Sequence, residues 1–238
     1  MILFSAFRVV QYISLLVAVL YVLEVSHRVS ADDNIDLRKK QAIAQYVGGA
    51  FAQSDKLIKP ERFPRISYYC PGKFCNNLVV TLKSDFPMKT EQLDAPTLNT
   101  EADIRVLMFP SLQALSAENA TFTRQEGDKV AILDDGKCSL IRVTRGEIVT
   151  QVIIRVVVDA QLRESELCVL EESLRGTGLV FPDRFSQYAA KYSKQDDAEY
   201  QTTIKGYRNL AVLHWSDLTR PGMNRVEVTK ALEAIELR

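Results

Sequence analysis

The stretch Cys168-Val-Leu-Glu-Glu-Ser-Leu-Arg-Gly-Thr-Gly-Leu179 decides the fold that the sequence predicts. It has the pattern of a helix, and Gly178 stands where a glycine commonly ends one. Residues four apart share a helix face, so Glu171 and Arg175 should form an ion pair, with the acid on the favoured N-terminal side. Glu172 points about 100° away from Glu171, which excludes a pair of carboxylates on one face.

The same stretch resembles the active-site helix of zincin metallopeptidases with its zinc ligands replaced. In that pattern two histidines one helical turn apart bind the metal and the glutamate after the first activates water. Here Glu171 and Arg175 occupy the places of the histidines, whereas Glu172 keeps the place of the base. The sequence has two histidines, His27 and His214, and a catalytic zinc needs three protein ligands. We therefore expect neither a metal nor another cofactor.

The histidine and the charged residues also have purely structural interpretations. His214 lies on the apolar side of a predicted helix next to Trp215, which favours a packed core histidine over a catalytic one. The charged residues of the opening stretch are compatible with the solvated side of an amphipathic helix. Its buried side would then carry Leu167, Leu170 and Leu174.

The N-terminus predicts export. An apolar run of about fifteen residues, Val9–Leu23, follows Arg8, and Val29–Ala31 has the small residues that a signal peptidase accepts. The run is shorter than the roughly twenty residues that span a bilayer. We expect a signal peptide over residues 1–31 and a periplasmic or extracellular protein, with a retained membrane anchor as the alternative.

The net charge and the chain length limit which partners and how many domains we expect. The net charge is zero, and removal of residues 1–31 would leave it near −1. No basic cluster extends beyond short runs such as Arg38–Lys40, so we expect no nucleic-acid partner. Residues 32–238 are enough for one sizeable core. They are predicted to form a single domain.

The four cysteines are expected to pair, because compartments outside the cytoplasm are oxidising. Cys70 and Cys75 enclose a Pro-Gly turn and should close a small loop, which leaves Cys138 to bond Cys168. Four residues separate the first two thiols, whereas a thioredoxin-like motif has two, and no second pair has metal-site spacing. Disulfides are therefore favoured over a zinc or redox site.

The rest of the chain predicts an α+β fold, a mixed sheet with flanking helices. The β-rich runs are Asn77–Lys83, Asp103–Phe109, Lys129–Leu133, Ser139–Thr144 and Glu147–Val158. Turns are predicted at Asp134–Gly136 and at Arg145-Gly146. The last run is apolar on most residues, as expected of a strand covered on both faces, and it leads directly into the helix of the opening stretch.

Helical periodicity predicts three more helices. They are Leu37–Gln53, Thr203–Trp215 and a last helix that ends near Ile235. Asn224 with Glu227 three residues later is a capping pair for the last one. The segment with prolines at positions 60 and 64 is predicted to be a loop, and residues 84–102 a loop or a poorly defined helix.

From about Ala102 to Ala234 the chain resembles the bacterial exported proteins of domain-of-unknown-function family 2927, which are similar to metal-free relatives of zincins. The matching residues are Ala102–Val106, Cys138, Gly146–Ile148, Cys168, Glu171, Glu172, Gly178-Leu179 and Pro221–Met223. Arg175 departs from the family, which usually has glutamine there, and so does Trp215–Asp217. The resemblance implies a zincin-like single domain, with its core over about residues 77–236, and export.

Two functions follow as hypotheses. The first is a non-catalytic binding or scaffolding module that uses Glu171, Glu172 and Arg175 or the neighbouring sheet edge to hold an envelope protein or peptide. The second is an atypical hydrolase with Glu172 as general base, either without a metal or with one recruited by oxygen ligands from Glu171, Asp183 or nearby acids. Arg175 disfavours the second, because a guanidinium would repel a metal at this place. A membrane partner is expected only if the N-terminal segment is retained.

Overall fold

The computed structural model describes residues 37, 39–85, 90–93, 103–117, 125–134, 136–158, 162–180 and 197–233. The chain divides into two units, residues 1–42 and 43–238. In the first unit residues 37 and 39–42 are described and are helical, whereas the predicted signal segment lies outside the described residues. Among the described helices, none combines the length and apolarity needed to cross a membrane.

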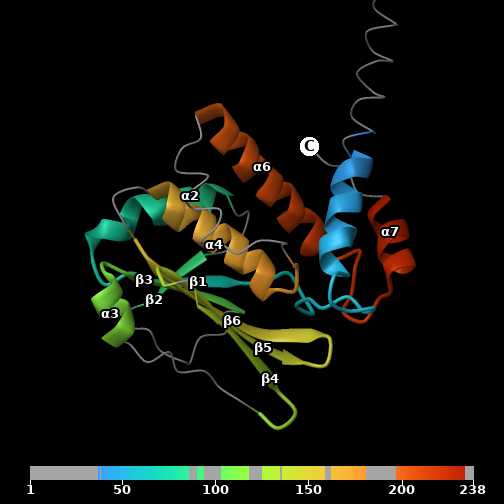
Figure 1. Cartoon of the computed structure of the whole chain (residues 1–238), viewed down its shortest axis with the longest axis horizontal. Coiled ribbons are helices and arrows are strands. Elements are labelled where there is room, and N and C mark those ends of the chain that lie inside the picture. The colour runs from blue at the N-terminus through green and yellow to red at the C-terminus, as the bar shows by residue number, and fades with distance from the viewer. Residues whose placement is uncertain are drawn as a thin grey trace, which may run out of the picture. The chain divides into compact units, whose positions relative to one another are not determined.

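A six-stranded mixed sheet organises the second unit, in the order β2-β1-β3-β6-β5-β4 (Figure 1). Strands β2, β1, β3 and β6 are parallel, whereas β4, β5 and β6 form an antiparallel meander. The strands are β1 Ile66–Tyr69, β2 Thr90–Leu93, β3 Ile104–Phe109, β4 Lys129–Asp134, β5 Cys138–Arg145 and β6 Ile148–Val157. The α+β class and the mixed sheet with flanking helices are as predicted.

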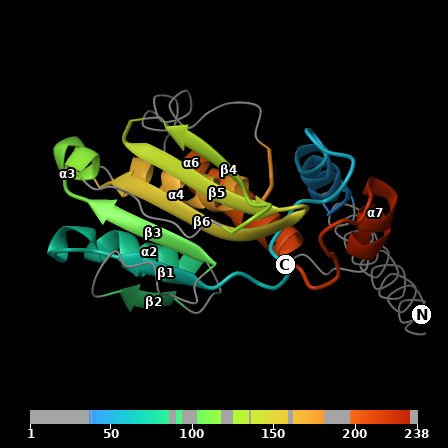
Figure 2. The ribbon, with the colours of Figure 1, turned by 90° about the horizontal axis from the view of Figure 1, so that it is seen from below.

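Helices cover the two faces of the sheet unequally. They are η1 Lys73–Cys75, α2 Asn76–Asp85, α3 Leu112–Ala117, α4 Leu162–Gly176, α6 Asp197–His214 and α7 Arg225–Glu233. Helix α4 lies on β5 and β6, with α2 beside it and α6 across it, and α3 contacts β3 and β6 (Figures 1 and 2). Helix α4 therefore lies in an interior layer, between the sheet and α6.

The two-residue period of the strands separates the sheet's faces. Leu140 and Val152 face α4, and a Cβ added to Gly176 would lie 2.5 Å from Val152 Cγ1. The opposite face carries Ile141 and Ile153, which pack with Leu115 of α3 in a buried apolar cluster. Strand β6 is thus covered on both faces, as its near-continuous apolar sequence predicts.

One predicted strand is wrong. The run Asn77–Lys83 is helical and belongs to α2. A short apolar run cannot be assigned from periodicity alone, and here the topology decides, because the parallel neighbours β1 and β2 need a crossover connection. Helix α2 provides that crossover. The strands it joins, Ile66–Tyr69 and Thr90–Leu93, fall in segments predicted to lack strands.

The other predicted strands and the last helix agree with the structure to within a few residues. Strands β3 to β6 match their predicted runs, and Gly136 and Gly146 have the positive φ of the two predicted turns, 74° and 59°. Asn224 Oδ1 accepts the backbone N–H of Glu227 at 3.1 Å, and the Glu227 carboxylate accepts that of Asn224 at 2.7 Å, so the capping pair is confirmed. Helix α6 begins at Asp197, six residues before the predicted start.

Gly178 ends α4 and admits a neighbouring segment. Its φ is +119°, and the N–H of Leu179 donates to the carbonyl of Leu174 at 3.0 Å, as in a helix end closed by glycine. A Cβ at this position would lie 2.0 Å from the backbone oxygen of Ile58. The segment around Ile58 is itself held by Lys59, whose N–H donates to Glu147 and whose carbonyl accepts from Val149.

We expect Gly178→Ala to lower the free energy of unfolding by about 3 kcal/mol or more, because it adds a backbone clash to an unfavourable φ. Gly146→Ala is the matched control, since its φ is also positive but a Cβ there meets nothing within 4 Å. It should lower the same quantity by about 1 to 2 kcal/mol. Urea denaturation of both variants measures the difference, and equal losses would contradict the close approach of Ile58.

Candidate functional site

Helix α4 is buried on all sides. Every side chain from Ser165 to Leu174 is buried, including three glutamates. The hypothesis that the charged residues form a solvated helix face is therefore wrong. Its physical reason is α6, which packs on the side of α4 turned away from the sheet. The residue pattern of α4 by itself does not show that another helix packs on its polar side.

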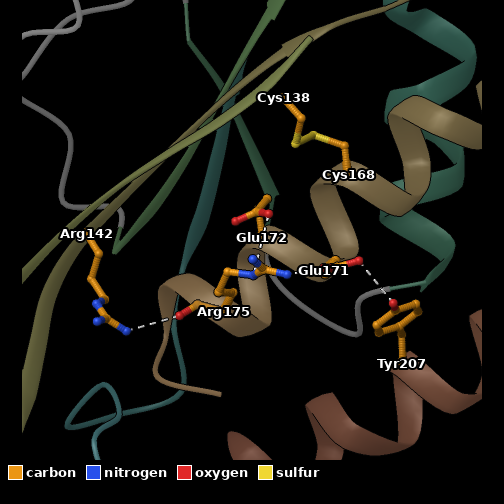
Figure 3. A network of polar contacts seen from close by, with 7 residues as sticks. All are labelled: Cys138, Arg142, Cys168, Glu171, Glu172, Arg175 and Tyr207. Atoms are coloured by element: carbon orange, nitrogen blue, oxygen red, sulfur yellow. Dashed lines mark hydrogen bonds and ion pairs between the residues drawn. A yellow bond between two sulfur atoms is a disulfide. The ribbon is translucent and has the colours of Figure 1, made fainter. Parts of the chain in front are cut away.

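The predicted ion pair is present in this buried setting. The Arg175 guanidinium contacts the Glu171 carboxylate, and Tyr207 of α6 donates its hydroxyl to Glu171 Oε2 at 3.2 Å (Figure 3). Burial makes this contact different from a surface pair. Removal of one partner would leave a charge in the interior, at a cost of several kcal/mol.

Arg175 also reaches the second predicted carboxylate. Its Nε lies 3.6 Å from Glu172 Oε1, and Arg142 of β5 donates from Nη1 to the Arg175 carbonyl at 3.3 Å (Figure 3). Burial lowers the pKa of the Arg142 guanidinium. One arginine thus joins carboxylates on two sides of α4, because spacings of three and four residues both fall within its reach.

A second tyrosine–glutamate contact lies about two turns before Tyr207 on α6, and the sequence analysis does not predict it. Tyr200 of α6 donates to Glu166 of α4, and the Arg163 guanidinium lies 4.7 Å from the centre of the Tyr200 ring. Burial raises the pKa of Glu166, and burial also raises that of Tyr200. The sequence signal that could have predicted these contacts is spacing. The two tyrosines are seven residues apart on α6, and the two glutamates they contact are five residues apart on α4.

The cysteine pairs lie as predicted. Cys138 and Cys168 are joined at an S–S distance of 2.02 Å, which connects β5 to α4 (Figure 3). Cys70 and Cys75 also form a pair, with their Cα atoms 6.3 Å apart. The first bond closes a loop of about 30 residues, for which the chain-entropy estimate is roughly 3 to 4 kcal/mol.

His214 is a core histidine, as predicted. Its Nε2 lies 2.7 Å from the Thr177 carbonyl, which can only accept, so Nε2 carries the proton and Nδ1 accepts from the Tyr46 hydroxyl at 3.2 Å. Trp215 Nε1 donates to the Thr177 hydroxyl at 3.1 Å. Burial lowers the pKa of His214 to about 3. The ring is neutral and fixes the end of α4 to α6.

Lys59 is a buried cation without a sequence signal. Its Nζ donates to the Ser216 carbonyl at 2.9 Å and to the carbonyl and hydroxyl of Thr219, both at 3.1 Å. Burial lowers its pKa to about 8, while Asp217 acts in the opposite direction. Lysine is rarely buried, and the preceding segment is a proline-containing loop, so no periodicity marks this residue.

The α4 cluster consists of two carboxylates held by one guanidinium. Within the described ranges no three His, Cys, Asp or Glu side chains are grouped so that they could hold a metal ion. Asp183, the other proposed ligand, lies outside those ranges. Glu171 and Glu172 are buried, and the Arg175 guanidinium compensates their charge. No family model, curated protein or solved structure matches the chain.

Replacing Arg175 with methionine should lower the free energy of unfolding by about 3 to 5 kcal/mol, because two buried carboxylates lose their cation. Adding Glu171→Gln and Glu172→Gln to this variant should restore part of the loss, since no uncompensated charge then remains. Urea denaturation provides the free energies.

Lys137→Met is the matched control for this series. Lys137 lies 3.6 Å from Glu164, but half of its side chain is exposed, so its replacement should change stability by less than about 1 kcal/mol. If Arg175→Met has an effect as small as that of Lys137→Met, the cluster is not the buried network described above.

Stability should fall in acid because of His214. Its pKa is about 3 when folded and 6.5 when unfolded, so the unfolded state binds an extra proton between these values. The contribution of the neutral His214 ring to the free energy of unfolding is complete above pH 6.5. It is lost as the pH falls toward 3, by about 1.4 kcal/mol per pH unit within this window. Denaturation across the window should give a shallower slope for His214→Gln, and parallel curves would contradict the assignment.

Proposed function

We propose that this chain is an exported, non-catalytic binding module with a zincin-like fold, which holds an extended segment of an envelope protein against strand β4. The supporting observation is the enclosure of Glu172. Its side chain is 5% exposed and faces the Arg175 guanidinium, on a helix that α6 covers. A general base must come within hydrogen-bond reach of the substrate's proton, and an enclosed carboxylate does not.

The zincin-like assignment has support from the order of elements. Helix α4 directly follows β6 and carries Glu171 and Arg175 where the resemblance places zinc ligands. Their side chains contact each other, as expected if an ion pair replaces the metal. Gly178 ends the helix as the pattern requires. Two cysteine pairs support export, because such bonds persist in oxidising compartments.

Strand β4 has the properties of a strand-addition site. It is the outermost strand of the sheet beside β5, and its six residues pair with β5 in unbroken register. The run Val130–Leu133 is apolar, and the side chain of Ile132 is 62% exposed. An outer strand offers one row of backbone donors and acceptors to an incoming strand. Lys129 and Asp134 border the apolar run and would define the length of the segment.

The exported protein, purified with its partner from the envelope fraction, tests strand addition. Ile132→Lys should abolish co-purification, because a lysine on an outer strand opposes pairing. Val226→Lys makes the same change at an apolar side chain on α7 that is 76% exposed, and it should leave co-purification unchanged. In the wild-type complex, amide hydrogen exchange should slow over residues 129–134.

Retention of the same partner by Ile132→Lys, or unchanged exchange in β4, would overturn this site. The catalytic alternative is tested separately by a peptide-hydrolysis assay of the purified protein. Hydrolysis that disappears in Glu172→Gln but persists in Glu164→Gln, at a partly exposed position of the same helix, would show that the module is an enzyme.

A further inference from the structure

A cavity of about 450 Å³ lies near the beginning of β6, away from the carboxylate cluster of α4. Lys59 and Thr219 are its buried residues, and Ile148 and Pro221 add partly buried apolar surface. A volume of this size is within the range of pockets for small ligands. No sequence pattern marked this cavity, because its walls come from three separate segments.

The walls are held by backbone hydrogen bonds. Lys59 donates its N–H to the Glu147 carbonyl at 3.1 Å and accepts from Val149 at 3.0 Å. On the other side, the N–H of Leu57 donates to Met223 and that of Gly222 to Leu57, both at 2.9 Å. The segment 57–59 is thereby fixed between β6 and the loop after α6. The cavity is therefore formed before a ligand binds, and binding loses little conformational entropy of the protein backbone.

The cavity carries an excess of positive charge. Three of its lining residues are basic, Lys59, Arg62 and Arg220, and two are acidic, Glu61 and Asp217. Lys59 is 2% exposed, and its three acceptors are uncharged oxygens of Ser216 and Thr219. Burial in a medium of low polarity disfavours this charge and lowers the pKa of Lys59 to about 8, so the ammonium group is stabilised by negative charge near it. Such a group favours an anion nearby.

We propose that this cavity binds a ligand with a single carboxylate group, either the C-terminus of a peptide or a free amino acid. The proposal does not depend on strand addition at β4. Arg220 and Arg62 supply guanidinium groups, whose geometry fits a carboxylate. Lys59 acts as a fixed charge beneath them, because its three donors are already used.

The two acidic side chains narrow the ligand class. Glu61 and Asp217 line the same cavity, so a ligand with two or more negative charges meets repulsion as well as attraction. A single carboxylate matches the one positive charge in excess. Arg62 already contacts Asp103 at 3.5 Å, which leaves Arg220 as the residue that should contribute most of the specific recognition.

The test is an NMR titration of the isotopically labelled exported protein with four probes. They are trialanine, trialanine amide, free alanine and inorganic phosphate. Trialanine should shift the amide signals of residues 59–62, 148 and 217–220, and its amide should not. Binding of free alanine with similar affinity identifies a small carboxylate as the ligand, whereas binding of trialanine alone identifies a peptide C-terminus.

Two variants complete the experiment. Arg220→Gln should weaken trialanine binding about tenfold or more, as expected for loss of a charge-assisted contact. Lys56→Gln removes the same charge from an exposed side chain outside the lining and should leave the affinity unchanged. Bound trialanine should also raise the titration midpoint of Lys59 above its value of about 8, which a purely structural lysine would not show.

Three results of the titration, and one of the comparison of variants, would overturn the proposal. The first is equal binding of trialanine and its amide, because the carboxylate would then be irrelevant. The second is tighter binding of phosphate than of either carboxylate, and the third is the absence of shifts in the lining residues. Equal weakening of trialanine binding by Lys56→Gln and Arg220→Gln would also overturn it, because the binding would then reflect the general charge of the protein and not a specific site.

Discussion

Burial of charge on helix α4 is the constraint on which the rest of this structure depends. Glu171 and Glu172 are taken out of water by the sheet on one side and α6 on the other, and Arg175 compensates both. Interior ions are tolerated only when partners satisfy them. Tyr207 of α6 donates to Glu171, and Tyr200 of α6 donates to Glu166, a third buried carboxylate of α4. The position of α6 along α4 is therefore specified by hydrogen bonds in addition to apolar packing.

The local features of the chain could be predicted from its sequence. The contact between Glu171 and Arg175 follows from helical spacing, the turns at Gly136 and Gly146 from glycine's tolerance of positive φ, and the last helix from its capping pair. Each of these depends on residues within four positions of one another. The cysteine pairing is the exception, and elimination among four cysteines was sufficient for it.

Features that depend on distant segments could not be predicted in this way. The sequence predicts no strand at β1, because its four residues carry no pattern of their own. It predicts a strand in place of α2, because the need for a crossover arises only from the parallel pairing. The burial of α4 depends on α6, more than twenty residues further along the chain. Lys59 finds its acceptors about 160 residues away, and no spacing rule describes such a contact.

The bond between Cys138 and Cys168 has a consequence for the alignment of helix and sheet. A helix on a flat apolar surface can slide by one turn, about 5.4 Å, and exchange one set of contacts for another. Here the disulfide at Cys168 attaches the middle of α4 to β5, and the backbone of Ile58 lies close to Gly178 just beyond the C-terminal end, so the helix is fixed at two points. The sliding motion is therefore blocked, and the polar groups of α4 have a single available alignment.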